Sequence, residues 1–300
     1  MSLSAHSRAW LQIHICVFLW GFTAILGKLI TLPALPLVWW RMLLVTVALL
    51  VWPPFWSGVR QMPRRLAAIH LGIGALVTLH WVTFYGSIKM SNASVAATCM
   101  ALSPVFVALI EPALARRPFI LTELLLSVAV LPGVALVVGG TPAGMRTGIA
   151  VGVFSAFVVG IFSSLNKRFI GTNSALAVTG LQMGTGAMLL PLVGWALPND
   201  TVLVAPGLRD AVLLVTLSMA CTLLPYSLAL VALRHLSAFA TTLAVNMEPV
   251  YAIALAVVLL GEQRDLTPGF YFGVALIMSV VFTHWWASRR AAPQTAVLAS

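Results

Sequence analysis

The sequence predicts an all-α integral membrane protein whose ten transmembrane helices form two inverted five-helix repeats, with both termini in the cytoplasm. Three features of the sequence predict this architecture. Hydrophobic residues make up 61% of the chain and charged residues 8%, with a mean hydropathy of +1.03, whereas a soluble domain carries roughly 25% charged residues. Apolar runs close to the roughly 20 residues that cross a bilayer recur along the chain. The second half also repeats sequence features of the first.

The predicted spans follow these apolar runs in order. They are 10–30, 35–52, 66–87, 91–113, 122–139, 147–168, 174–196, 210–232, 237–260 and 268–287. The first run extends toward Lys28 without a small-residue cleavage site, so we expect no removable signal peptide. Cys16, Cys99 and Cys221 all fall in apolar runs, and we expect free, buried packing residues there.

Basic residues predict the orientation of the spans. With the N-terminus inside, the inner segments hold 11 of the 17 lysines and arginines and the outer segments hold five, while Arg41 lies within a span. Such a bias in short loops is the usual signal for the cytoplasmic side. It also explains the net charge of +10 better than a nucleic-acid partner does, and we expect none. Both termini are therefore predicted to be cytoplasmic, including a tail over residues 291–300.

The repeat is visible as matched residues at a nearly constant offset. Pro104 corresponds to Pro249 at an offset of 145, and the same offset pairs Lys89 with Arg234. The segment WGFTAILGK (20–28) answers VGIFSSLNK (159–167). We therefore divide the chain into repeats at 1–142 and 143–290. Each repeat has an odd number of spans, so the second enters the membrane from the opposite face, an arrangement frequent in secondary transporters.

These residues give the chain a resemblance to the EamA family of the drug/metabolite transporter superfamily. The resemblance covers essentially the whole chain and rests on residues in both repeats. They are Trp20-Gly21, Arg41 and TFYGSIKMSNASVAATCMALSPVF (83–106), then YSLALVALRHLSAFATTLAVNMEPVY (226–251) followed by LLGE (259–262). The family implies ten helices around a central cavity and export or exchange of small metabolites, amino acids among them. One departure is that Arg116-Arg117 stands where the second copy has Gly261-Glu262.

Glu248 is the main candidate for coupling or gating, because it lies near the middle of the span 237–260. A charged group at that depth is costly, and intramembrane acids tend to mark ion paths or paired sites. It could carry a coupling proton, pair structurally with Arg41 or contact the substrate directly. Pro104 and Pro249 remove a backbone hydrogen bond at equivalent depth in the two copies, which suits hinges or simple packing kinks.

Arg41 is the main candidate for substrate binding, because a guanidinium can donate two parallel hydrogen bonds to a carboxylate. Its depth of about 9 Å, at 1.5 Å per residue, would also allow it to snorkel to the interface. Gln182 takes its place in the second copy. The remaining candidates are a histidine and deep aromatic residues that could wall a cavity: Trp20, His80, Trp81, Tyr85, Tyr226 and Tyr251.

The leading functional hypothesis is a secondary active transporter that exports a small polar metabolite across the bacterial inner membrane by alternating access. An amino acid or a related compound is the first substrate class, and protons are a possible coupling ion. Alternatives are a flippase for lipids or lipid-linked molecules, a structural subunit, or a carrier for nucleobases or vitamins. Catalytic motifs and metal-ligand spacings are missing, so we expect no enzyme, metal or cofactor. The chain could act as a monomer or a homodimer.

Overall fold

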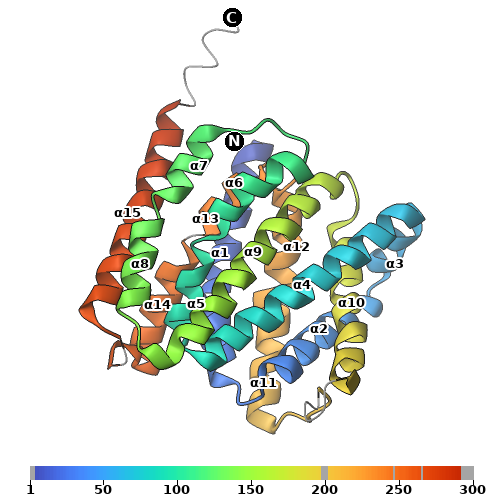
Figure 1. Cartoon of the computed structure of the whole chain (residues 1–300). Coiled ribbons are helices and arrows are strands. Elements are labelled where there is room, and N and C mark those ends of the chain that lie inside the picture. The colour runs from blue at the N-terminus through green and yellow to red at the C-terminus, as the bar shows by residue number, and fades with distance from the viewer. Residues whose placement is uncertain (1–3, 197–201, 246, 265, 292–300) are drawn as a thin grey trace, which may run out of the picture.

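The computed structural model describes residues 4–196, 202–245, 247–264 and 266–291, and within these ranges every regular element is helical (Figure 1). The predicted tail over 291–300 falls outside them except for its first residue. Seven helical stretches of the described chain are long and apolar enough to cross a membrane, and a bent pair makes eight if it counts as one span. The predicted all-α membrane class is confirmed at this level.

The helices follow the predicted apolar runs closely. The first half contains α1 (Ala5–Leu29), α2 (Ala34–Leu50), α3 (Pro53–Gln61), α4 (Arg64–Met90), α5 (Ala93–Met100), α6 (Ser103–Leu114), α7 (Leu121–Val128) and α8 (Leu131–Gly139). The second half contains η1 (Ala143–Met145), α9 (Arg146–Phe169), α10 (Ala175–Ala196), α11 (Leu208–Ser218), η2 (Met219–Leu223), α12 (Leu224–Ala232), α13 (Ala238–Val245), α14 (Glu248–Leu255), η3 (Ala256–Leu260), η4 (Glu262–Arg264) and α15 (Pro268–Ala291).

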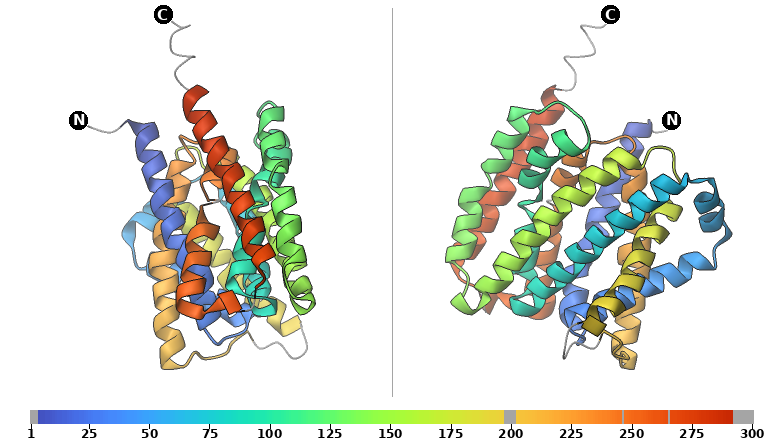
Figure 2. Two further views of the ribbon diagram at one scale, coloured as in Figure 1. Left: turned by 90° about the vertical axis from the view of Figure 1, so that its left-hand side faces the viewer. Right: turned by 45° about the vertical axis from the view of Figure 1, so that its right-hand side comes forward.

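The helices form one bundle in which α1 packs against helices of both halves (Figures 1 and 2). It contacts α4 and α5 from the first half and α12, α13 and α14 from the second. The pair α8 and α15 closes one edge of the bundle, while α2, α3 and α10 lie at the opposite edge. The beginning of α1 and the end of α15 lie at the same end of the bundle.

Prolines mark where several apolar runs divide into two helices. Pro104 is the second residue of α6, and Pro249 is the second residue of α14. Proline is tolerated in the first turn because the N–H group that it lacks would have no partner within the helix there. Both prolines are buried. Each proline therefore lies in the first turn of the second helix of one candidate span, Ala93–Leu114 or Ala238–Leu260, a place that suits either a hinge or a packing kink.

Two buried carboxylates join the halves of the chain at helix N-termini. Glu262 accepts hydrogen bonds from the backbone N–H groups of Ala93 and Ser94, each at 3.0 Å, and from the Ser94 hydroxyl at 2.7 Å. Glu111 accepts bonds of 2.9 Å from the first two backbone N–H groups of α13. Each carboxylate satisfies donors that a helix leaves unpaired. In the alignment of the two repeats, Arg117 corresponds to Glu262. In the structure, the Nε atom of Arg117 lies 3.1 Å from a carboxylate oxygen of Glu111.

Helix α3 was not predicted, because its nine residues are too few to span a bilayer and begin with two prolines. It turns 89° away from α2.

The close contact between α8 and α15 depends on glycine. A Cβ atom on Gly133 of α8 would lie 2.7 Å from the carbonyl oxygen of Gly273 on α15. A side chain of any size at position 133 would therefore push α8 and α15 apart.

Candidate functional site

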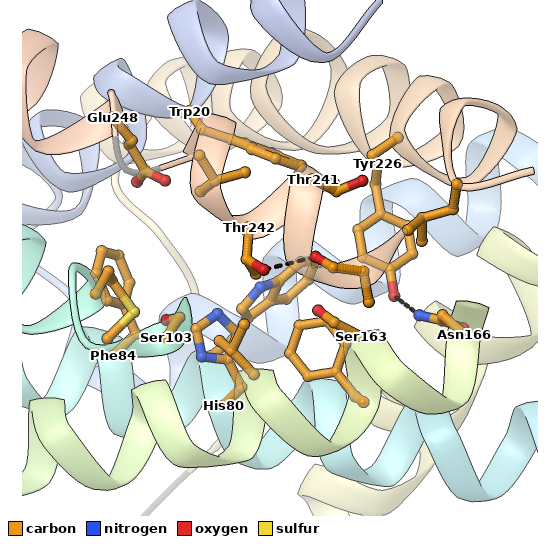
Figure 3. Close-up of a pocket in the computed structure, with 18 of the residues that line it drawn as sticks. Trp20, His80, Phe84, Ser103, Ser163, Asn166, Tyr226, Thr241, Thr242 and Glu248 are labelled. Atoms are coloured by element: carbon orange, nitrogen blue, oxygen red, sulfur yellow. Dashed lines mark hydrogen bonds between the residues drawn. The ribbon is translucent and has the colours of Figure 1, made fainter. Parts of the chain in front are cut away.

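A cavity of about 130 Å³ lies between the two halves of the bundle (Figure 3). Residues of α1, α2, α4, α5, α6, α9, α12, α13 and α14 line it. Six of the predicted site residues are among them: Trp20, Arg41, His80, Trp81, Tyr226 and Glu248. The volume is below the roughly 300 Å³ of ordinary small-molecule pockets. A substrate of more than a few heavy atoms therefore needs the walls to move apart.

Glu248 begins helix α14 and faces the cavity (Figure 3). Its side chain is buried, with 8% of the residue exposed. Within the described residues its carboxylate accepts no hydrogen bond and forms no ion pair. The position in the first helical turn favours a negative charge, because the partial charge of a helix N-terminus is positive. Glu248 is thus a buried acid whose carboxylate has no hydrogen-bond partner among the described residues.

Arg41 lies on α2 and is held by three hydrogen bonds. Its Nε donates to the Thr222 hydroxyl at 2.6 Å, Nη1 donates to the Tyr85 hydroxyl at 2.8 Å, and Nη2 donates to the Cys221 carbonyl at 3.4 Å. The guanidinium also lies over the ring of Trp81, 3.8 Å from its centroid. Only 2% of the residue is exposed, so the interpretation that Arg41 snorkels to the interface is wrong.

Two N–H groups of Arg41 remain without a hydrogen bond among the described residues, because a guanidinium has five and three are used. The structural pairing of Arg41 with Glu248 is also not formed: neither of the two ion pairs in the described chain involves these residues. A cation with spare donors and a carboxylate without a direct ion pair or hydrogen bond among the described residues therefore line the same cavity.

The second half has an uncharged counterpart of the Arg41 network. The Tyr226 hydroxyl donates to Gln182 at 2.5 Å, and the Gln182 amide donates to Asn166 at 2.7 Å. Tyr226 follows Tyr85 at the offset of 141 that also separates Gln182 from Arg41. In each half, therefore, a buried tyrosine bonds to the polar residue of the neighbouring helix. Gln182 supports the Tyr226 wall but does not itself line the cavity.

His80 and Trp20 line the cavity from helices α4 and α1. The Nδ1 atom of His80 is hydrogen-bonded to the Ser155 hydroxyl at 2.8 Å, which fixes the ring between α4 and α9. Trp20 is half-buried, and in Figure 3 its indole lies between the Glu248 carboxylate and Thr241.

The other predicted residues lie outside the cavity lining. Tyr85 acts through its hydrogen bond to Arg41. Tyr251 is 38% exposed. Its ring packs against that of Phe18, with centroids 5.7 Å apart, and its side chain lies close to Gly21 of α1. Pro104 and Pro249 adjoin lining residues without lining the cavity themselves. The structure thus gathers one charged pair and four other predicted residues, and separates Tyr251 from them.

Comparison with known proteins decides the family. The EamA-like transporter family matches residues 8–139 and, a second time, residues 146–285. The chain belongs to the EamA-like transporter family. The curated relative named "Uncharacterized inner membrane transporter YicL", from Salmonella typhimurium strain LT2, is 25% identical over 298 residues, which is 95% of this chain and 97% of the relative. The predicted resemblance is confirmed, and the chain is a multi-pass membrane transporter.

A solved structure described as "Crystal structure of protein" shares the fold of this EamA-like transporter. It aligns with a TM-score of 0.70 over 95% of this chain and 99% of its own length, at 16% sequence identity. At that identity the similarity shows the fold alone.

Sequence reasoning about this EamA-like transporter missed two hydroxyl groups in the cavity. Thr23 and Thr241 line it, and in the described chain their buried hydroxyls have no hydrogen-bond partner. Thr242, by contrast, donates to the carbonyl of Ala238 at 2.6 Å. An unused hydroxyl cannot be recognised from sequence, since a threonine in a helix usually bonds to the carbonyl four residues earlier.

Proposed function

We propose that this EamA-like transporter is a secondary active carrier that exports a small polar metabolite, an amino acid or a related compound, across the bacterial inner membrane. The observation that supports this proposal best is that two opposite charges line one cavity without a direct ion pair between them. Among the described residues, two N–H groups of Arg41 and the carboxylate of Glu248 have no hydrogen-bond partner. A zwitterion carries the complementary charges, and burial strengthens each contact because water screens little there.

Arg41 is the proposed receptor for the substrate carboxylate. Its remaining N–H groups can donate charge-assisted hydrogen bonds, which are stronger than bonds between neutral groups. The bonds to Thr222, Tyr85 and Cys221 hold the guanidinium in place before substrate arrives. The cost of ordering a long side chain on binding is therefore reduced.

Glu248 is the proposed coupling residue. Its carboxylate faces the cavity and accepts no hydrogen bond from the described residues, so it can take up a proton when the cavity is empty. It can also face the ammonium group of a bound substrate, but a protonated carboxyl no longer has the charge for that contact. Substrate and proton therefore compete for Glu248. A carrier that binds either one, but not both at the same time, would exchange substrate for protons across the membrane.

The proposed framework for alternating access is ten spans in two repeats, 1–142 and 143–290, of opposite orientation, with both termini in the cytoplasm. The small cavity volume of about 130 Å³ supports an arrangement in which the walls separate during transport. Pro104 and Pro249 are the proposed gating positions, because each begins a new helix after a break and interruptions of this kind can act as hinges.

Counterflow in proteoliposomes tests the proposal. Vesicles loaded with one amino acid at a time are diluted into the labelled compound, with wild type, Arg41→Gln and Glu248→Gln compared and folding checked by size-exclusion chromatography. We expect saturable exchange of one amino-acid class in wild type and its loss in Arg41→Gln. Thr242→Val is the matched control, because its hydroxyl is already bonded to the backbone. Absence of exchange for every amino acid would remove that substrate class.

A further inference from the structure

A surface groove lies where α2 ends and α3 begins, and it shares no lining residue with the central cavity. Figure 1 shows α3 at the edge of the bundle. We call this depression the α3 groove. Its lining has an apolar part, which we call the floor, with Leu50, Val51 and Trp56, and a polar part, which we call the rim, with Ser57, Arg60 and Gln61.

The orientation of α3 places this groove at a membrane surface. Since α3 turns 89° from α2, it lies along the bilayer plane if α2 crosses the bilayer. Phe55 anchors it: the side chain is 6% exposed, and a Cβ on Gly180 of α10 would lie 2.3 Å from its ring. An amphipathic helix held in this way sits at the boundary between headgroups and acyl chains.

The floor of the α3 groove is left uncovered by the protein. Val51 is 79% exposed, Trp56 44% and Leu50 42%. The Trp56 indole donates a hydrogen bond of 2.7 Å to the Leu50 carbonyl, which fixes the ring across the corner between the helices. Tryptophan is enriched at membrane interfaces because its ring is apolar and its N–H is polar. The floor is thus a fixed apolar surface suited to the upper part of an acyl chain.

The rim carries positive charge that the protein does not neutralise. Arg60 is exposed, and Arg64 and Arg65 follow at the start of α4. Neither ion pair of the described residues involves them. Cations in the first turn of a helix are unfavourable with respect to the helix dipole, so Arg64 and Arg65 do not stabilise α4. Among the described residues Arg60 therefore gives the groove a positive charge without an acidic partner, and Arg64 and Arg65 follow it closely along the chain.

We propose that the α3 groove binds an anionic phospholipid, with the headgroup phosphate at Arg60 and an acyl chain over Leu50 and Val51. Only an amphiphile matches both the apolar floor and the basic rim. An anionic headgroup is preferred over a zwitterionic one because each arginine near an anionic lipid contributes about 1 kcal/mol. The site is independent of transport through the central cavity.

Native mass spectrometry of the purified protein tests this assignment. The protein is equilibrated with equal amounts of phosphatidylglycerol and phosphatidylcholine, and the ratio of retained lipids is measured. We expect wild type to prefer phosphatidylglycerol and Arg60→Gln to lower the ratio about fivefold. Arg146→Gln is the matched control, because Arg146 is also exposed but does not line the α3 groove. Trp56→Ala should lower the retention of both lipids.

Three outcomes would overturn the assignment. Wild type could retain the two lipids equally, or Arg146→Gln could lower the ratio as much as Arg60→Gln does. Free glycerol phosphate could also displace phosphatidylglycerol as well as a short-chain phosphatidylglycerol does, which would indicate a site for a soluble anion. Counterflow through the central cavity is not needed for any of these readouts, so they are decided separately from the proposed transport activity.

Discussion

Replacing Glu262 by alanine is expected to lower the free energy of unfolding by about 3 kcal/mol. The carboxylate accepts two backbone hydrogen bonds of 3.0 Å from Ala93 and Ser94 and a third of 2.7 Å from the Ser94 hydroxyl. Each bond to a charged acceptor contributes about 1.5–3 kcal/mol. The variant also no longer has to bury a charge, and this gain offsets part of the loss. The estimate is therefore lower than the sum of three bonds.

Unfolding in detergent with increasing sodium dodecyl sulfate, followed by circular dichroism, measures this change. Glu262→Gln keeps one carbonyl acceptor and should show a smaller loss. Gln263→Ala is the control, because this neighbouring side chain is exposed and should change stability by less than about 0.5 kcal/mol. If Glu262→Ala unfolds at the same detergent concentration as wild type, Glu262 does not hold the halves together as argued.

Three further predictions concern one glycine contact and two cavity groups. Gly133→Ala should destabilise the protein by about 1–3 kcal/mol, because the new methyl group would press on the backbone of α15. Gly139→Ala is the control and should not destabilise the protein, because Gly139 has open space around it. Thermal unfolding of the two variants measures the difference. Glu248→Gln should remove the pH dependence of counterflow, and flux that still follows pH would exclude Glu248 as the proton carrier. Thr241→Val should raise the KM for counterflow about 2–10-fold by removing one free hydroxyl, while Thr242→Val should leave KM unchanged, since its hydroxyl is already bonded to the backbone.

The helices could be predicted from sequence because hydropathy and length decide them. The apolar run 66–87 became α4, Arg64–Met90, and the run 147–168 became α9, Arg146–Phe169. Helix α3 escaped prediction because an interfacial helix needs only a few apolar residues, and these look like a loop between two spans. Its position depends on Phe55 meeting Gly180, a contact between distant segments that no local pattern reveals.

The candidate site could be predicted only in part. Residue type and depth singled out Arg41 and Glu248, because charges within a span are rare. The same reasoning counted Tyr251 among the aromatic residues that could wall a cavity, but Tyr251 packs toward α1 instead. Which hydroxyls remain unbonded, as at Thr241, depends on the packing of several helices and has no sequence signature.

The duplicated framework places equivalent positions around the cavity but puts charge on only one member of each pair. Glu248 and Ser103 are the first residues of α14 and α6, at the repeat offset of 145, and both line the cavity. Arg41 likewise corresponds to the neutral Gln182. A cavity with equal charges in both halves could accept a zwitterion in two opposite orientations. With the cation from the first half and the anion from the second, a zwitterionic substrate of the kind proposed above would match both charges in only one orientation.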